Sequence, residues 1–183
     1  MNPLAYWLDR ILVVVQRVAR FAIIVGGIAI LLSAFMITID VIARRVLGLS
    51  TWGADEFSYY ALAISTSWAF SYAMLVKAHI RIDVITSRLD RRLRSICNII
   101  ALLAMGFFAL AACQAVLHEV ERAWSRGATS ITMMETPMWI PKGLWLAGFI
   151  FFAVTVFLLL LRVIVALVIE RDYEAVERHG GAV

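Results

Sequence analysis

Four apolar blocks, each about 20 residues long, limit what this chain of 183 residues can fold into. They cover residues 21–42, 57–76, 96–117 and 143–161 and contain almost no charged side chains. A helix of ~20 residues extends roughly 30 Å, the thickness of the hydrocarbon core of a bilayer. Hydrophobic residues make up 63% of the chain, and a soluble domain could not keep so much apolar surface from water. The blocks predict an all-α integral membrane protein with four transmembrane helices in a single domain, residues 1–183.

Two further segments have the pattern of amphipathic helices that lie in a membrane surface. Residues 4–18 place an apolar side chain at every helical turn and carry charged residues between them. Residues 84–94 gather their apolar side chains on one face, and four arginines point elsewhere. We expect both to be interfacial helices, the second one attracted to anionic lipid of the inner leaflet. For 84–94, an ordinary solvated turn is the alternative.

The distribution of positive charge predicts how the chain crosses the membrane. Of the 17 Lys and Arg residues, five fall in the connections 43–56 and 118–142, and the other twelve fall in the two tails and in the connection between the second and third spans. Positive residues collect on the cytoplasmic side, so both termini should be cytoplasmic. The net charge of +4 then reflects topology, and we expect no nucleic acid partner.

Few residues within the spans could carry chemistry. His79 and His118 lie at opposite ends of their spans, so they cannot hold one haem between them, and the third histidine is close to the C-terminus. Asp40 is the one ionisable residue inside a span, and Arg44 follows it by one helical turn, which predicts an ion pair. We therefore expect no catalytic, cofactor-binding or metal-binding residues, and no enzyme activity.

Small residues and tryptophans point to contacts with other helices or other proteins. The second span is rich in Ser and Ala, which permits close helix packing within the chain or against another subunit. Four of the six tryptophans, including Trp52, Trp124 and Trp139, fall at the expected outer boundary. They form an aromatic belt that anchors the protein, and they could also offer a docking surface. The sequence leaves both pairs of alternatives open.

Short motifs follow one another along most of the chain, each where a span begins or ends. They are Arg44 and Arg45 after the first span; Trp52 and Glu56 before the second; His79, Arg81, Asp83, Arg88 and Leu89 after it; and Thr136, Pro137, Trp139 and Pro141 before the fourth. In this order and with this topology, the chain resembles the small membrane subunit of tripartite ATP-independent periplasmic (TRAP) transporters, the DctQ family.

The resemblance implies a division of labour among three proteins. A large many-helix membrane subunit carries the substrate and ion sites, a periplasmic binding protein delivers an organic acid, and a cation gradient, usually of sodium, drives import. The small subunit would scaffold the large one in a bacterial inner membrane. The main alternative is a haem-free membrane anchor for a respiratory or redox complex. A small self-sufficient transporter is disfavoured by the shortage of polar groups within the spans.

Three specific expectations follow for this chain. Glu56 should pair with Arg44 across the outer end of the first two spans and fix their register. The outer loops, from Trp52 and from Trp124 to Trp139, are where a loaded binding protein could touch this subunit. The segment 84–94 should anchor the scaffold to the inner leaflet.

Overall fold

The computed structural model describes residues 3–48, 53–76, 91–130, 132 and 134–170, and nearly all of them are helical. The helices are α1 (Pro3–Leu47), α2 (Ala54–Leu75), α4 (Arg91–Ser125) and α5 (Trp139–Val165); a π-helical turn, η1 (Ala166–Glu170), continues α5. The expected all-helical class, with one long helix at each apolar block, is confirmed. Within the described residues, α1, α4 and the continuous α5–η1 are long and apolar enough to cross a membrane. The more polar α2 does not meet that measure, so the span expected over 57–76 remains a prediction.

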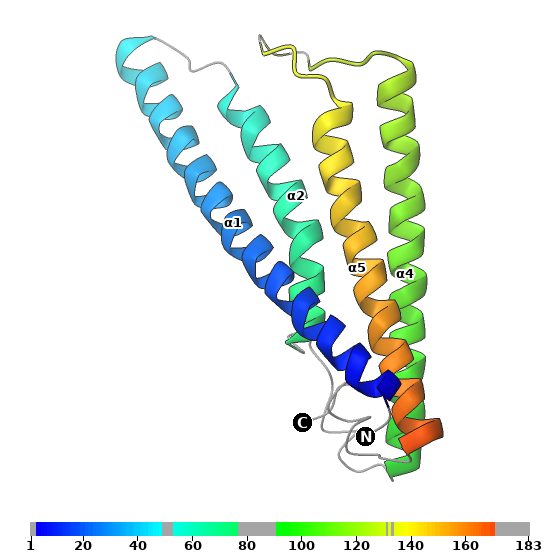
Figure 1. Ribbon diagram of the computed structural model, residues 1–183. Coiled ribbons are helices and arrows are strands. Elements are labelled where there is room, and N and C mark those ends of the chain that lie inside the picture. Colours follow the sequence, from blue (N-terminus) through cyan, green and yellow to red (C-terminus); the bar gives the residue numbers. More distant parts are fainter. Residues whose placement is uncertain (1–2, 49–52, 77–90, 131, 133, 171–183) are drawn as a thin grey trace.

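The four helices stand side by side in one layer, in the order α1, α2, α5, α4 (Figure 1). Each helix packs mainly on its neighbours in this row, and α5 packs on all the others because the start of α1 also crosses it. In the most apolar 18-residue segment of each helix, the buried share is 44% for α5–η1, 17% for α4 and 11% for α1. A single layer therefore leaves most apolar side chains of the outer helices exposed on two broad faces.

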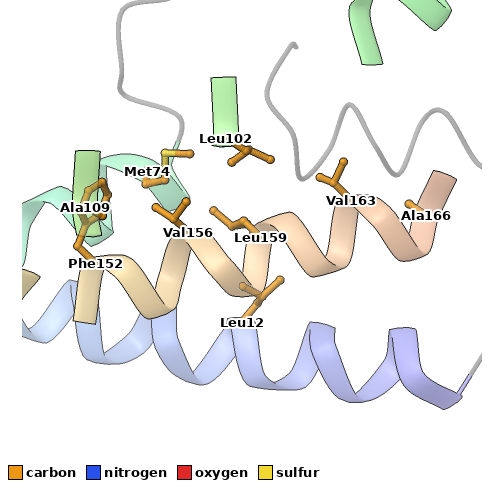
Figure 2. Close-up of a cluster of buried hydrophobic side chains, with 9 residues drawn as sticks. All are labelled: Leu12, Met74, Leu102, Ala109, Phe152, Val156, Leu159, Val163 and Ala166. Atoms are coloured by element: carbon orange, nitrogen blue, oxygen red, sulfur yellow. The ribbon is translucent and has the colours of Figure 1, made fainter. Parts of the chain in front are cut away.

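The main core lies along one side of α5. Phe152, Val156, Leu159 and Val163 recur at helical spacing, and Figure 2 shows them facing side chains from the other three helices: Leu12 of α1, Met74 of α2, and Leu102 and Ala109 of α4. Lipid tails are as apolar as these side chains, so close van der Waals packing holds this core together more than the removal of surface from water.

The first helix does not divide where the sequence suggested. We expected an interfacial helix over 4–18 and a separate span over 21–42, but α1 is continuous from Pro3 to Leu47. Nothing between Pro3 and Gly48 breaks the helix, and Gly48, with φ 67°, ends it. Buried residues follow a seven-residue repeat through the whole helix: Ala5, Leu8, Leu12, Val15, Ala19, Gly26, Ser33 and Asp40. One continuous seam along α1 thus packs first on α5 and then on α2.

Small residues allow α2 to pack closely on both of its neighbours, α1 and α5. A side chain at Gly26 of α1 would approach the Cβ of Ser65 to 2.8 Å, and one at Gly148 of α5 would overlap the hydroxyl of Ser67. The Ser65 hydroxyl also donates a hydrogen bond to the Gly26 carbonyl, 3.1 Å away. The expected close packing of the second helix through small residues is confirmed within this chain.

The molecule has two ends that differ in their polar contacts. The "loop end" holds the α1–α2 and α4–α5 connections, and the "terminal end" holds the start of α1 and the end of α5 (Figure 1). α4 continues past the apolar block to Ser125 at the loop end and stops before Gly127, whose φ is 56°. Residues 77–90 lie outside the described residues, so the helix expected over 84–94 is not tested; residues 91–94 form the first turn of α4.

Candidate functional site

A buried carboxylate organises the loop end. Glu56 lies in the first turn of α2, is only 7% exposed, and directly precedes the apolar block that begins at Phe57. Tyr60, one turn later, donates its hydroxyl to Glu56 Oε1 at 2.6 Å. Ser130 Oγ donates to Oε2 at 2.6 Å, and the Thr132 hydroxyl donates to the same oxygen. The carboxylate thus joins the start of α2 to a loop more than 70 residues later in the chain.

That loop, residues 128–138, is a narrow antiparallel turn held by its own backbone. The Ser130 N–H donates to the Thr136 carbonyl at 2.9 Å, and the Met138 N–H donates to the Ala128 carbonyl at 2.9 Å. Thr129 and Pro137 form an isolated antiparallel bridge, and Glu135 turns the chain with a left-handed φ of 45°. This framework, which we call the 128–138 loop, places the two hydroxyls over Glu56.

Gly53 makes the close approach of the loop possible. Its φ of 110° suits glycine, and a side chain there would meet the sulfur of Met134 in the 128–138 loop. The carboxylate of Glu56 also sits at the positive end of the α2 dipole. Gly53 before α2 and Glu56 in its first turn therefore together hold the 128–138 loop against the start of α2.

The hydrogen bonds keep Glu56 charged. Burial raises its pKa, but the hydroxyl hydrogen bonds, of which those from Ser130 and Thr132 are the strongest, lower it by more. The pKa of Glu56 falls from 4.5 to about 2. A carboxylate that accepts several hydrogen bonds is stabilised in its ionised form, so the group holds the loop as an anion at any physiological pH.

The predicted pairing of Glu56 with Arg44 is wrong. Arg44 forms its ion pair with Asp40, one turn earlier on α1, as the spacing also predicted. A pair within one helical turn needs no further ordering of the chain. Glu56 instead takes neutral donors, which can enter a buried site without the cost of desolvating a cation.

The two tryptophans expected at the outer boundary meet at the loop end. Trp124, near the end of α4, and Trp139, at the start of α5, are in edge-to-face contact with ring centroids 5.1 Å apart. Their side chains are 67% and 40% exposed, so the pair presents an aromatic surface. Of the neighbouring prolines, Pro137 is exposed in the 128–138 loop, whereas Pro141 is buried in the first turn of α5, where proline costs no hydrogen bond.

An ion-pair cluster joins α4 to α5 beside the tryptophans. Glu119 of α4 accepts from Arg122 at 2.6 Å and from Lys142 of α5 at 2.9 Å. The hydrogen bond and charge of Lys142, together with the charge of Arg122, lower the pKa of the Glu119 carboxyl. The cluster is largely exposed, so it contributes little to stability and mainly orients the two helix ends.

At the terminal end, an ion pair that the sequence did not suggest joins the first and last helices. Arg162 of α5 donates Nε to Asp9 Oδ1 at 2.7 Å and Nη2 to Oδ2 at 3.3 Å. The Arg162 side chain is 6% exposed and that of Asp9 is 37% exposed. A long arginine side chain at the end of a span ordinarily extends toward the membrane surface, but Arg162 is buried against α1. The sequence feature that could have indicated this pair is Asp9, an acidic residue among the apolar positions of 4–18.

Several predicted residues lie outside the described part of the chain. They are Trp52 before α2, and His79, Arg81, Asp83 and Arg88 after it. Among the residues that the structure does describe, no three His, Cys, Asp or Glu side chains are grouped so that they could hold a metal ion.

Long apolar helices in one layer, fixed by polar contacts at both ends, define a multi-pass membrane protein. The sequence model of the DctQ component of tripartite ATP-independent periplasmic transporters matches residues 33–166, so the chain belongs to this non-enzymatic family of transporter subunits. The match runs from the middle of α1 to the end of α5. Comparisons with curated proteins and with solved structures found no match.

Proposed function

We propose that this chain scaffolds the large membrane subunit of a TRAP transporter that imports an organic acid. A periplasmic binding protein delivers the solute, and a cation gradient, of sodium in our proposal, drives its entry. Both termini are cytoplasmic in this proposal, because twelve of the 17 positive residues lie on that side. The loop end then faces the periplasm.

The single-layer arrangement is the observation that best supports a scaffold. Large apolar side chains are exposed along the outer helices, such as Phe107 at 77% and Phe21 at 70%. A layer has two faces, so lipid can cover one of them while a partner subunit covers the other. Glu56 at the loop end and Arg162 at the terminal end tie the layer together, which keeps its shape fixed while a transport domain moves beside it.

The test is purification of the chain from its native host in a mild detergent, with identification of the proteins that remain bound. We expect one large polytopic membrane protein at equal stoichiometry. Recovery with a redox enzyme would instead support the alternative of a respiratory membrane anchor, and recovery of the chain alone would contradict the scaffold.

The loop end also suggests where the binding protein docks. Trp124 and Trp139 form an exposed aromatic pair next to the 128–138 loop. Trp52, which lies outside the described residues, is part of the docking surface in our proposal. Replacing Trp124 and Trp139 with alanine should slow uptake when the binding protein is limiting but not when it is in excess. Unchanged uptake at limiting binding protein would show that this contact is unimportant.

At the opposite side of the bilayer, we propose that 84–94 anchors the scaffold to anionic lipid. Replacing its arginines with glutamine should weaken binding of a peptide of residues 84–94 to vesicles containing phosphatidylglycerol, by about five-fold per arginine. Equal binding to neutral vesicles would contradict this role.

A further inference from the structure

A cavity of about 490 Å³ lies in the wedge where α1 separates from α5. The start of α1 packs on the end of α5 through Ala5 and Leu8, and from there α1 diverges and continues along α2 (Figure 1). α1 supplies one wall, from Val18 to Ala29, and the start of α5 supplies the other. α2 forms the floor.

The lining of this wedge accepts only an apolar occupant. The few polar groups on its border already have partners within the chain. The Tyr60 hydroxyl donates to Glu56, the Ser65 hydroxyl donates to the Gly26 carbonyl, and Trp68 Nε1 donates to the Leu144 carbonyl at 3.2 Å. The side chain of Thr136 also hydrogen-bonds to Glu56, and the remaining lining residues are apolar. A polar solute entering here would lose its water without gaining hydrogen bonds.

The dimensions fit a hydrocarbon chain better than a helix. The wall from Val18 to Ala29 is about 16 Å long at 1.5 Å per residue. Spread over that length, the volume gives a cross-section of roughly 30 Å², whereas a helix about 10 Å across needs roughly 80 Å². If a methylene group takes about the ~30 Å³ of a water molecule, the cavity has room for about sixteen of them. That is the length of an ordinary acyl chain.

Positive charge flanks the end of the wedge nearest the terminal end. Arg17 precedes the lining residue Phe21 by one helical turn, so both lie on the same side of α1. Arg10 lies two turns earlier on that side, with its guanidinium 5.3 Å from the centroid of the Tyr6 ring. Arg17 and Arg20 are exposed, and no carboxylate among the described residues pairs with either.

We propose that this wedge binds one acyl chain of an acidic phospholipid, with Arg17 contacting the lipid phosphate. The chain lies between α1 and α5 over Ala61 and Ser65 of α2, and the head group stays in the interface at the start of the span. The lipid would fill the space that the diverging helices leave and stiffen the layer. This site is separate from 84–94 and does not depend on which complex the subunit joins.

The test uses the full chain reconstituted in vesicles of phosphatidylethanolamine and phosphatidylglycerol, the latter carrying a photoreactive group in one acyl chain. After transfer to a mild detergent that removes bulk lipid, illumination should label residues 18–29 of α1. The variant Ala29→Phe fills the wedge and should reduce the label to background. The matched variant Ala34→Phe, on an exposed position outside the wedge, should leave it unchanged.

Head-group recognition is tested by Arg17→Gln, a surface change that leaves the packing intact. It should lower retention of phosphatidylglycerol about five-fold relative to phosphatidylethanolamine, whereas Arg45→Gln, at the other end of α1, should not. Labelling spread evenly over the exposed face of α1, or equal loss in both phenylalanine variants, would overturn the proposal. So would cross-linking of wedge residues to a partner protein in the purified complex.

Discussion

Each end of the molecule joins distant segments of the chain through buried charge, and the two ends do so in opposite ways. At the loop end, Glu56 remains a single anion, stabilised by neutral hydroxyls and by the start of α2. At the terminal end, Asp9 and Arg162 form an ion pair between α1 and α5. The first arrangement orders a loop around one charge, and the second holds two helices together through two charges. The consequences of mutation should therefore differ between the ends.

The largest effect is expected from breaking the ion pair. Asp9→Ala should lower the free energy of unfolding in detergent by about 3 kcal/mol, because it removes the carboxylate that accepts two hydrogen bonds from the buried Arg162. The double variant Asp9→Ala, Arg162→Met should recover much of that loss. Arg10→Ala, an exposed neighbour, should change stability by less than about 0.5 kcal/mol. Additive losses in the double variant would mean that the pair does not couple α1 to α5.

Removing the anion at the loop end should have a somewhat smaller but more local effect. Glu56→Ala should cost about 2 kcal/mol, since hydrogen bonds to a charged group contribute about 1.5–3 kcal/mol and water can reach the freed hydroxyls. It should also raise amide hydrogen exchange in the 128–138 loop. Asp55→Asn provides the control, because Asp55 is exposed beside it on the same turn. Loss of stability without faster exchange in the loop would contradict the role given to Glu56.

Single hydroxyls should each contribute less. Tyr60→Phe and Thr132→Val remove one donor each while the other donors remain, so each should cost about 1 kcal/mol. Ser58→Ala, whose hydroxyl bonds only within its own helix, is the matched control on α2. If Tyr60→Phe and Glu56→Ala are equally destabilising, the hydroxyls act as one unit instead of as separate donors.

The contrast between the ends also explains what the sequence could predict. Local sequence patterns predicted the helices, and a spacing of one turn predicted the Asp40–Arg44 pair. Apart from Tyr60, one turn away, the partners of Glu56 are 74 and 76 positions away, and Asp9 is 153 positions from Arg162. Pairings at such distances depend on the order of the helices in the layer. The sequence therefore indicated Glu56 as a site residue, but it did not indicate the hydroxyls of Ser130 and Thr132 as its partners.

The order of the helices in the layer could not be predicted from the sequence, and the reason is physical. In water, an amphipathic helix shows which face it buries, but in a bilayer both the lipid-facing and the protein-facing sides are apolar. The informative residues are instead the small ones, and Gly26 and Gly148 do mark where α2 packs. The seven-residue repeat of α1 was also present in the sequence, and it signals one uninterrupted helix across the expected break at residues 19–20.

The smallest effect is expected from pH. The pKa of Glu56 is about 2 in the folded protein and 4.5 ordinarily, so its ionised form is favoured by folding. Its contribution is fully present above about pH 4.5 and is lost as the pH falls from there toward 2. Amide exchange in the 128–138 loop, corrected for its intrinsic pH dependence, should be constant between about pH 5 and 8, and the protection that Glu56 confers relative to Glu56→Gln should fade only below about 4.5. Loosening of the loop between pH 7 and 5 that Glu56→Gln abolishes would show that the hydroxyls do not hold Glu56 as an anion.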